Sequence, residues 1–246
     1  MSCDYCDEQK GIKTVYHEIY GGISRIVFKT KNFIVFPCLG QLREGHLLIA
    51  SKAHINAIGM LPDDLMQEID ALILQIGQFF REVYHQEVLC FEHGVLGDEG
   101  ANGGCGIYHL HLHLLPATHK EFSTVLDHVK NHNANQLFKA QEIMDTRRCV
   151  ALQNTYVFLA YGNEGGLQES YLITNADNYF VSQYMRRIVS EILGKLDWNW
   201  RDNQHIETTF LRTLEKSKTF FAKSSELQKY EISEESKEGF PMLVHS

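Results

Sequence analysis

Three histidines at alternate positions in an apolar run restrict the fold of this chain more than any other feature. The segment 106–116 reads GIYHLHLHLLP, so that His109, His111 and His113 alternate with tyrosine and leucine. Alternation with a period of two predicts a half-buried β-strand. Residues on one face of a strand are about 6.5–7 Å apart, which separates the backbones of His109 and His113 by about 13 Å. One metal ion does not easily bind all three, so we expect separate sites along the strand, or one metal ligand beside one catalytic residue.

A Cys-x-x-Cys pair, Cys3 and Cys6, lies at the beginning of the sequence. Redox pairs of the thioredoxin type follow a strand, and the two residues before Cys3 are too few to form one. Zinc needs two more ligands, and histidine is the usual partner of a thiolate pair. His54, which follows a predicted strand, and His109 are the candidates. We therefore predict a structural zinc site, with a Cys-x-x-Cys pair that binds nothing as the alternative.

If His109 turns to the metal, His111 is the candidate nucleophile on the same face of the strand. A neutral imidazole attacks phosphorus well and titrates near neutrality. A backbone carbonyl on its other ring nitrogen would fix the tautomer. His113 and the amides of the glycine-rich loop 97–106 would then bind phosphate oxygens, and three surface histidines on a sheet are the alternative. The candidate residues of this loop are Asn102, Gly104, Cys105 and Gly106.

Hydrophobic periodicity predicts an α+β fold. A long helix begins after Pro62, because two acidic residues follow this proline and apolar residues then keep helical spacing to Val83. We expect this helix and several strands to form a catalytic domain over residues 1–122. The strands that precede the histidine strand are predicted at 15–20, 25–30, 32–39, 46–52 and 88–94.

The composition changes after about residue 125, and residues 123–246 are expected to form an accessory α+β region. An amphipathic helix at 179–194 places Gln183, Arg186 and Arg187 within about one turn. Arginine binds phosphate oxygens in pairs, so these residues are candidates for phosphate contacts, with a solvated helix face as the alternative. The other predicted elements are a helix at 122–132, a polar helical stretch to about 146, a hairpin of strands 156–162 and 169–175, and a helix at 203–222.

Charge and composition argue against several classes of protein. The net charge is −8 and no basic run occurs, so we expect no binding to nucleic acid. The sequence contains no stretch of 18 apolar residues of the kind that predicts a membrane span. Its first ten residues lack the apolar core of a signal peptide. The 6 cysteines lack the spacing of a disulfide framework. These features together predict a cytoplasmic protein.

The His-apolar-His-apolar-His run resembles the signature of the histidine-triad (HIT) superfamily of nucleotide hydrolases and transferases. The segment 43–54, REGHLLIASKAH, is similar to the family's strand-then-histidine segment, and residues 91–116 are similar to its catalytic end. The Cys-x-x-Cys pair resembles the zinc-containing branch, which includes relatives of galactose-1-phosphate uridylyltransferase. The resemblance covers about residues 1–120. It implies a HIT-like antiparallel sheet with a long helix packed on it, followed here by an α+β extension of a hairpin and helices.

The resemblance also implies a two-step displacement at the α-phosphate of a nucleotide. His111 matches the nucleophile, which forms a nucleotidyl-histidine that water or a second acceptor resolves, and His113 matches a phosphate contact. The positions that match the metal ligands of the zinc branch are Cys3, Cys6, His54 and His109.

The family's ligands imply where a nucleotide lies and how the chain assembles. The nucleobase occupies an apolar slot formed by the early strands, and small members are commonly dimers, so a homodimer is expected. The candidate residues for the slot, with ordinary core as the alternative, are Ile26, Phe28, Phe36 and Leu39.

Two departures from the family pattern concern the leaving group. A Gln-Ser pair of many small members is replaced by Cys105 and Gly106, and their Asn-Glu-Gly is replaced by Glu92, His93 and Gly94. Transferase relatives have glutamine as the third triad residue, so a histidine there favours a hydrolase. We therefore expect hydrolysis of a nucleotide phosphoanhydride, phosphoester or phosphoramidate. The alternatives are nucleotidyl transfer to phosphate or a sugar phosphate, and nucleotide binding without catalysis.

Overall fold

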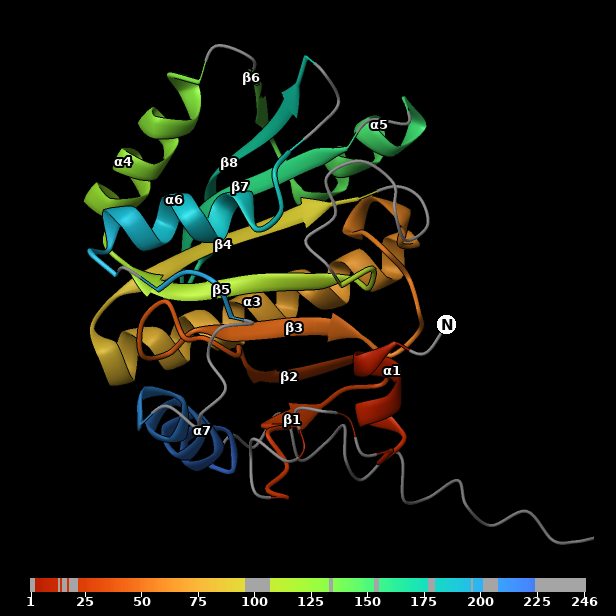
Figure 1. Cartoon of the computed structure of the whole chain (residues 1–246), viewed down its shortest axis with the longest axis vertical. Helices are drawn as coiled ribbons and strands as arrows, with labels where there is room; N and C mark the ends of the chain where they lie inside the picture. Colours follow the sequence, from red (N-terminus) through yellow and green to blue (C-terminus); the bar gives the residue numbers. More distant parts are fainter. Residues whose placement is uncertain are drawn as a thin grey trace, which may run out of the picture.

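The chain is arranged around one antiparallel sheet (Figure 1). A computed structural model describes residues 3–12, 14, 17, 22–95, 107–132, 135–152, 155–176, 180–195, 197–200 and 208–223. Within these residues the sheet has eight strands in the order β1-β2-β3-β5-β4-β7-β8-β6, and every neighbouring pair is antiparallel. The strands are β1 (Phe28–Lys29), β2 (Phe33–Pro37), β3 (Leu47–Ser51), β4 (Glu87–Gly94), β5 (His111–Ala117), β6 (Asn135–Ala140), β7 (Tyr156–Asn163) and β8 (Gly166–Asn175).

The long helix α3 (Asp63–Tyr84) covers one face of the sheet, as the spacing of its apolar residues predicts. Its core includes Leu112 and Leu114, the leucines that alternate with the histidines of β5. None of the helices in the described part of the chain is both long and apolar enough to cross a membrane. The remaining helices are α1 (Asp4–Gln9), α4 (His119–Lys130), α5 (Thr146–Ala151), α6 (Tyr184–Ile192) and α7 (Thr208–Phe221), with 3-10 turns η1 (Ile58–Met60) and η2 (Ile143–Asp145).

Helices cover the opposite face of the sheet in two patches. Over β4, β7 and β8, α4 and α6 form a core that includes Phe122 and Met185. Over β2 and β3, α1 packs through Tyr5. Figure 1 shows α6 in front of the sheet and α3 behind it. Because side chains alternate along a strand, His111 and His113 of β5 are on the face with α1 and α6, opposite Leu112 and Leu114.

The prediction of a helical stretch up to residue 146 is wrong. Asn135–Ala140 form β6, which pairs with β8 at the edge of the sheet. Only the last of its six residues, Ala140, is buried, so the apolar alternation that marks a half-buried strand in a sequence is absent. Pairing of its backbone with a distant strand determines its structure instead.

Three other predicted elements differ in extent. The strand expected at 25–30 is reduced to Phe28–Lys29, and α6 begins only at Tyr184. His109 lies before β5 rather than within it. The strand expected at 15–20 lies outside the described residues except for His17. The predicted hairpin is present as β7 and β8.

The second half of the chain continues the sheet of the first half. β7 pairs with β4, so β7, β8 and β6 extend the sheet beyond the histidine strand. The predicted boundary at residue 122 lies inside α4. Division into two domains at this position therefore stays a prediction about folding units.

The carboxyl group of Glu92, a residue of β4, is buried beside the 3-10 turn η1. Its side chain is 1% exposed and accepts hydrogen bonds from the Ile58 amide, at 2.7 Å, and the Tyr156 hydroxyl, at 2.7 Å. The Tyr156 hydroxyl in turn accepts a hydrogen bond from the Gly59 amide at 3.0 Å. Burial raises the pKa of Glu92 to about 7, although both hydrogen bonds oppose that shift.

We expect the folded protein to lose stability between pH 4.5 and 7.5 through this group. A pKa raised in the folded state gives stability that is complete below the unfolded value and is lost as the pH rises through 7. The difference between this pKa and that of an ordinary carboxyl corresponds to a change of about 3 kcal/mol in the free energy of unfolding. Glu92→Gln should remove that part of the pH dependence, measured as unfolding free energy in urea at several pH values. An unchanged slope, equal to that of the exposed control Glu82→Gln, would show that Glu92 is ionised throughout.

Candidate functional site

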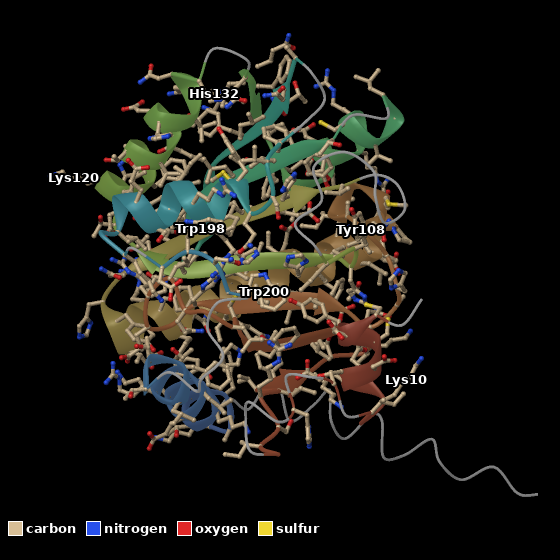
Figure 2. The ribbon with its side chains drawn as sticks, viewed as in Figure 1. Lys10, Tyr108, Lys120, His132, Trp198 and Trp200 are labelled. Atoms are coloured by element: carbon tan, nitrogen blue, oxygen red, sulfur yellow. The ribbon has the colours of Figure 1, made fainter. Side chains whose placement is uncertain are left out.

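A cavity lies on the face of the sheet that carries the histidines. Its walls come from α1, the segment after β2, the beginning of β3, the strands β4 and β5, and α6 with the segment after it. Figure 2 shows Trp200, from that last segment, in front of β5 and β3. The residues that line it include Tyr5, Arg25, Cys38, Leu39, Leu48, Phe91, His93, His111, His113, Gln183, Arg186 and Trp200.

His111 is held in one tautomer by the residue two positions before it. Its Nδ1 lies 2.6 Å from the carbonyl oxygen of His109. A carbonyl has no proton to give, so Nδ1 carries the hydrogen and donates it. In the neutral ring the lone pair is then on Nε2. This is the tautomer that a nitrogen nucleophile requires.

His113 is held by a second buried histidine, His46. The Leu42 amide donates to Nδ1 of His46 at 3.3 Å, so the proton of His46 is on Nε2. That Nε2 lies 2.9 Å from Nδ1 of His113 and donates to it. The relay leaves the proton of His113 on its own Nε2, as a hydrogen-bond donor. Burial lowers the pKa of both rings well below the ordinary value, and the nearby rings and Arg186 act in the same direction.

The loop that carries His46 is fixed by the second half of the chain. Thr213 of α7 accepts a hydrogen bond from the Gly45 amide at 2.8 Å and donates one to the Gln41 side chain at 2.9 Å. Lys195, after α6, donates to the carbonyl of Gln41. Gly45 has φ 94°, and a Cβ there would lie 2.9 Å from Pro116, so this turn requires glycine. The described end of the chain therefore supports the relay to His113.

Four sulfur and nitrogen ligands meet between α1 and the sheet. Cys3 and Cys6 place Sγ 3.4 Å and 3.6 Å from Nδ1 of His109, and Cys6 lies 3.5 Å from Nδ1 of His54. All four ligand atoms lie within 4.8 Å of one another. Tetrahedral zinc with ordinary bond lengths separates sulfur from nitrogen by about 3.6 Å. The residues present therefore fit a zinc ion with four protein ligands.

The surroundings of His109 also suit a metal ligand. Its Nε2 lies 2.7 Å from the Ser51 carbonyl, to which it donates, so the unprotonated Nδ1 is the nitrogen that faces the two sulfurs. A second hydrogen bond of this kind orients most histidine ligands. Burial above all lowers the pKa of His109 to about 4, which keeps the ring neutral.

α1 is attached to the sheet by more than the ligand cluster. Arg25, 1% exposed, forms a paired ion bridge to Glu8, with distances of 2.7 Å and 2.6 Å. Its guanidinium lies over the Phe36 ring, 4.2 Å from the centroid. Tyr5 of α1 packs edge-on against Phe36 and against His111, with centroid distances of 5.3 Å and 5.7 Å. α1 thus forms part of the wall around His111.

The structure separates the two adjacent arginines of α6. Arg186 is 4% exposed, lines the cavity and donates to Trp198, Cys38 and Gly40. None of these acceptors is a carboxylate, so in the described part of the chain the Arg186 charge has no ion-pair partner. Arg187 is exposed and lies over the Trp198 ring at 4.1 Å, outside the cavity lining.

Some of the other predicted site residues line the cavity, and others lie elsewhere or outside the described residues. Gln183 lines the cavity, and of the four residues predicted for the base slot only Leu39 does. Phe28 instead packs in the core on the α3 side. The predicted loop residues Asn102, Gly104, Cys105 and Gly106 lie outside the described residues.

Sequence reasoning did not identify the roles of His46, Arg25, Tyr5 and His93. His46 is inside the segment REGHLLIASKAH, and His93 stands where the family pattern has glutamate, so both had a signal in the sequence. Arg25 and Tyr5 had none, because their role depends on the packing of α1 against β2.

Comparison with known proteins identifies relatives of the first half of the chain. A family model described as HIT domain matches residues 23–120. A HIT-like protein of Chlamydia pneumoniae is 31% identical over 104 residues, which are 42% of this chain and 91% of that protein. A solved HIT family member from Bacillus subtilis has a TM-score of 0.36 and 20% identity, covering 49% of this chain and 76% of that one. A zinc-bound histidine triad family protein from Mycobacterium smegmatis has a TM-score of 0.34 and 20% identity, covering 48% and 77%.

Proposed function

Because the chain belongs to the HIT domain family, we propose that it cleaves a nucleotide at the α-phosphate through a nucleotidyl intermediate on His111. The observation that carries this proposal is the hydrogen bond from Nδ1 of His111 to the His109 carbonyl at 2.6 Å. It leaves the lone pair on Nε2, in a residue that lines the cavity. The same carbonyl stabilises the positive charge that the ring acquires when Nε2 forms a bond.

The reaction has two displacements at phosphorus. In the first, the lone pair of Nε2 forms the N–P bond while the bond to the leaving group breaks, and the leaving group keeps that electron pair and takes a proton from solvent. In the second, a water oxygen forms a P–O bond, the N–P electron pair returns to Nε2, and the proton of the water passes to solvent. An acceptor hydroxyl or phosphate in place of water makes the same chemistry a transfer.

The other cavity residues act on the phosphate. The Nε2–H of His113, whose direction the His46 relay fixes, donates to a phosphate oxygen. Arg186 supplies a buried positive charge beside it, with N–H groups beyond its three bonds to neutral acceptors. Arg187 is not part of this proposal, because it lies outside the cavity lining.

Zinc, held by Cys3, Cys6, His54 and His109, has a structural role in this proposal. It would fix α1, and with it Tyr5, against the histidine strand. Four protein ligands leave no open position for a substrate, so the chemistry belongs to His111.

We expect a covalent adduct of one nucleoside monophosphate per chain. The native protein is mixed with nucleoside diphosphates, dinucleotides and phosphoramidates of the four common bases, quenched in base and examined by intact-mass spectrometry. Base is used because phosphohistidine bonds are labile in acid. Product analysis with and without added phosphate or sugar phosphate separates hydrolysis from transfer. Absence of any adduct and any turnover across the panel would favour a nucleotide-binding protein without catalysis.

A further inference from the structure

Two polar side chains in the cavity have buried atoms that nothing in the described part of the chain satisfies. Both ring nitrogens of His93 are buried without a hydrogen-bond partner among these residues, and so is Oε1 of Gln183. Both residues line the cavity that contains His111. Buried polar atoms almost always have partners in folded proteins. Two residues with unmet atoms in one cavity therefore indicate a ligand that supplies the missing bonds.

The backbone of Gln183 supports the same conclusion. This residue precedes α6 with φ 59° and ψ 31°, in the left-handed region that residues other than glycine rarely adopt. Its side chain is 5% exposed, and its Nε2 donates to Asn199 at 2.9 Å. That bond orients the amide and leaves the oxygen as the unmet atom. Strained residues of this kind occur where a site needs a particular side-chain position.

The chemistry of the unmet atoms defines the group that they bind. Oε1 of Gln183 only accepts, so the ligand must donate an O–H or N–H to it. Burial lowers the pKa of His93 to about 4, so its ring is neutral and offers one donor and one acceptor. A cationic donor is disfavoured because Arg186 lines the same cavity, and an anion is disfavoured by the oxygen of Gln183. The fitting group is a neutral hydroxyl or amide.

The position of these residues assigns them to one side of the reacting phosphate. His93 is on β4, and Leu48, an apolar residue of the cavity lining, is on β3. These two strands flank β5 on opposite sides. His111 and His113 of β5 lie between them. A nucleotide whose phosphate lay at His111 and whose base lay against Leu39 and Leu48 would therefore extend its leaving group toward β4, where His93 and Gln183 line the cavity.

We propose that His93 and Gln183 form a subsite that recognises a neutral hydroxyl or amide N–H on the leaving group. The proposal rests on the proposed function, because it takes the phosphate to react at His111. It assigns to β4 and the start of α6 the selection of substrates by what lies beyond the α-phosphate. Neither residue touches the reacting atoms in this proposal, so both act on specificity.

The test uses two nucleoside 5′-phosphoramidates that differ only in the amine. One carries glucosamine and the other carries cyclohexylamine, so both leaving groups contain a six-membered ring and only one has hydroxyls. Each is prepared with the four common ribonucleosides. The measured quantity is kcat/KM for the first compound divided by kcat/KM for the second. Comparing this ratio between variants cancels the intrinsic reactivity of the two amines.

We expect His93→Phe and Gln183→Met each to lower the ratio about tenfold, because each removes one hydrogen bond to a hydroxyl. Phenylalanine keeps the ring that packs edge-on against Phe180 at 5.5 Å, and methionine keeps the length of glutamine. Glu191→Gln, on the exposed side of α6, is the matched control and should leave the ratio within twofold. If the variants reduce both substrates equally, or change neither, the proposal is overturned.

Failure of the proposed function gives a different result. If the native protein cleaves neither compound, catalysis at His111 is disproved for them, and calorimetric affinities replace kcat/KM in the same ratio. A preference for the glucosamine compound that His93→Phe and Gln183→Met abolish would still support the subsite. Equal affinities of the native protein for both compounds would overturn it.

Discussion

We expect His111→Asn to lower kcat by about 10⁴-fold or more, because in the proposed mechanism the variant has no lone pair that can form the bond to phosphorus. Asparagine retains an N–H that can reach the His109 carbonyl, so the strand and the neighbouring ligand cluster should keep their structure. The change is measured as kcat on the best nucleotide of the panel and as loss of the covalent adduct by intact mass. KM should change far less than kcat, since the side chain acts in bond formation.

The controls for this prediction separate chemistry from folding. His128→Asn replaces an exposed histidine of α4 and should retain full activity. The melting temperature of His111→Asn should lie within about 3 °C of the native protein, which corresponds to roughly 1 kcal/mol in a chain of this size. Turnover that survives in His111→Asn, or an adduct mapped by peptide mass to another residue, would contradict the assigned nucleophile.

The local pattern of the sequence predicts which histidines face the candidate site, whereas the residues that hold those histidines in place depend on distant packing. Alternation along β5 correctly separates His111 and His113 from Leu112 and Leu114, because strand geometry fixes which side chains share a face. His46 belongs to the same relay but acts only when the loop after β2 folds under α7. No local period encodes that contact.

The second half shows the same limit. Arg186 and Arg187 are neighbours in the sequence, but adjacent helical residues differ by about 100° in direction. One is therefore buried against Gly40 and the other is stacked on Trp198, and only the packing of α6 decides which. β6 was missed for a related reason, since an exposed edge strand carries no apolar pattern.

Removal of the metal ligands should affect stability more than chemistry. We expect one zinc ion per chain in protein purified without chelators, and little zinc in the double variant Cys3→Ala, Cys6→Ala, both measured by elemental mass spectrometry. Formation of a structural metal site is coupled to folding. We therefore expect the double variant to lose about 3–4 kcal/mol of unfolding free energy, which corresponds to a melting temperature roughly 10 °C lower in a chain of this size. Lys10→Ala, an exposed residue just after α1 (Figure 2), is the control and should retain both zinc and stability.

The activity of the zinc-free variant distinguishes a structural metal from a catalytic one. His111 is not among the four ligands, and its tautomer depends on a backbone carbonyl rather than on the metal. The link between the two sites is Tyr5, whose ring meets His109 at 5.6 Å and His111 at 5.7 Å, and Arg25 still ties α1 to the sheet through Glu8 when the metal is lost. We therefore expect kcat to fall only severalfold at a temperature where the variant is folded. A loss of kcat as large as that of His111→Asn, with the fold intact by circular dichroism, would assign the metal to the reaction itself.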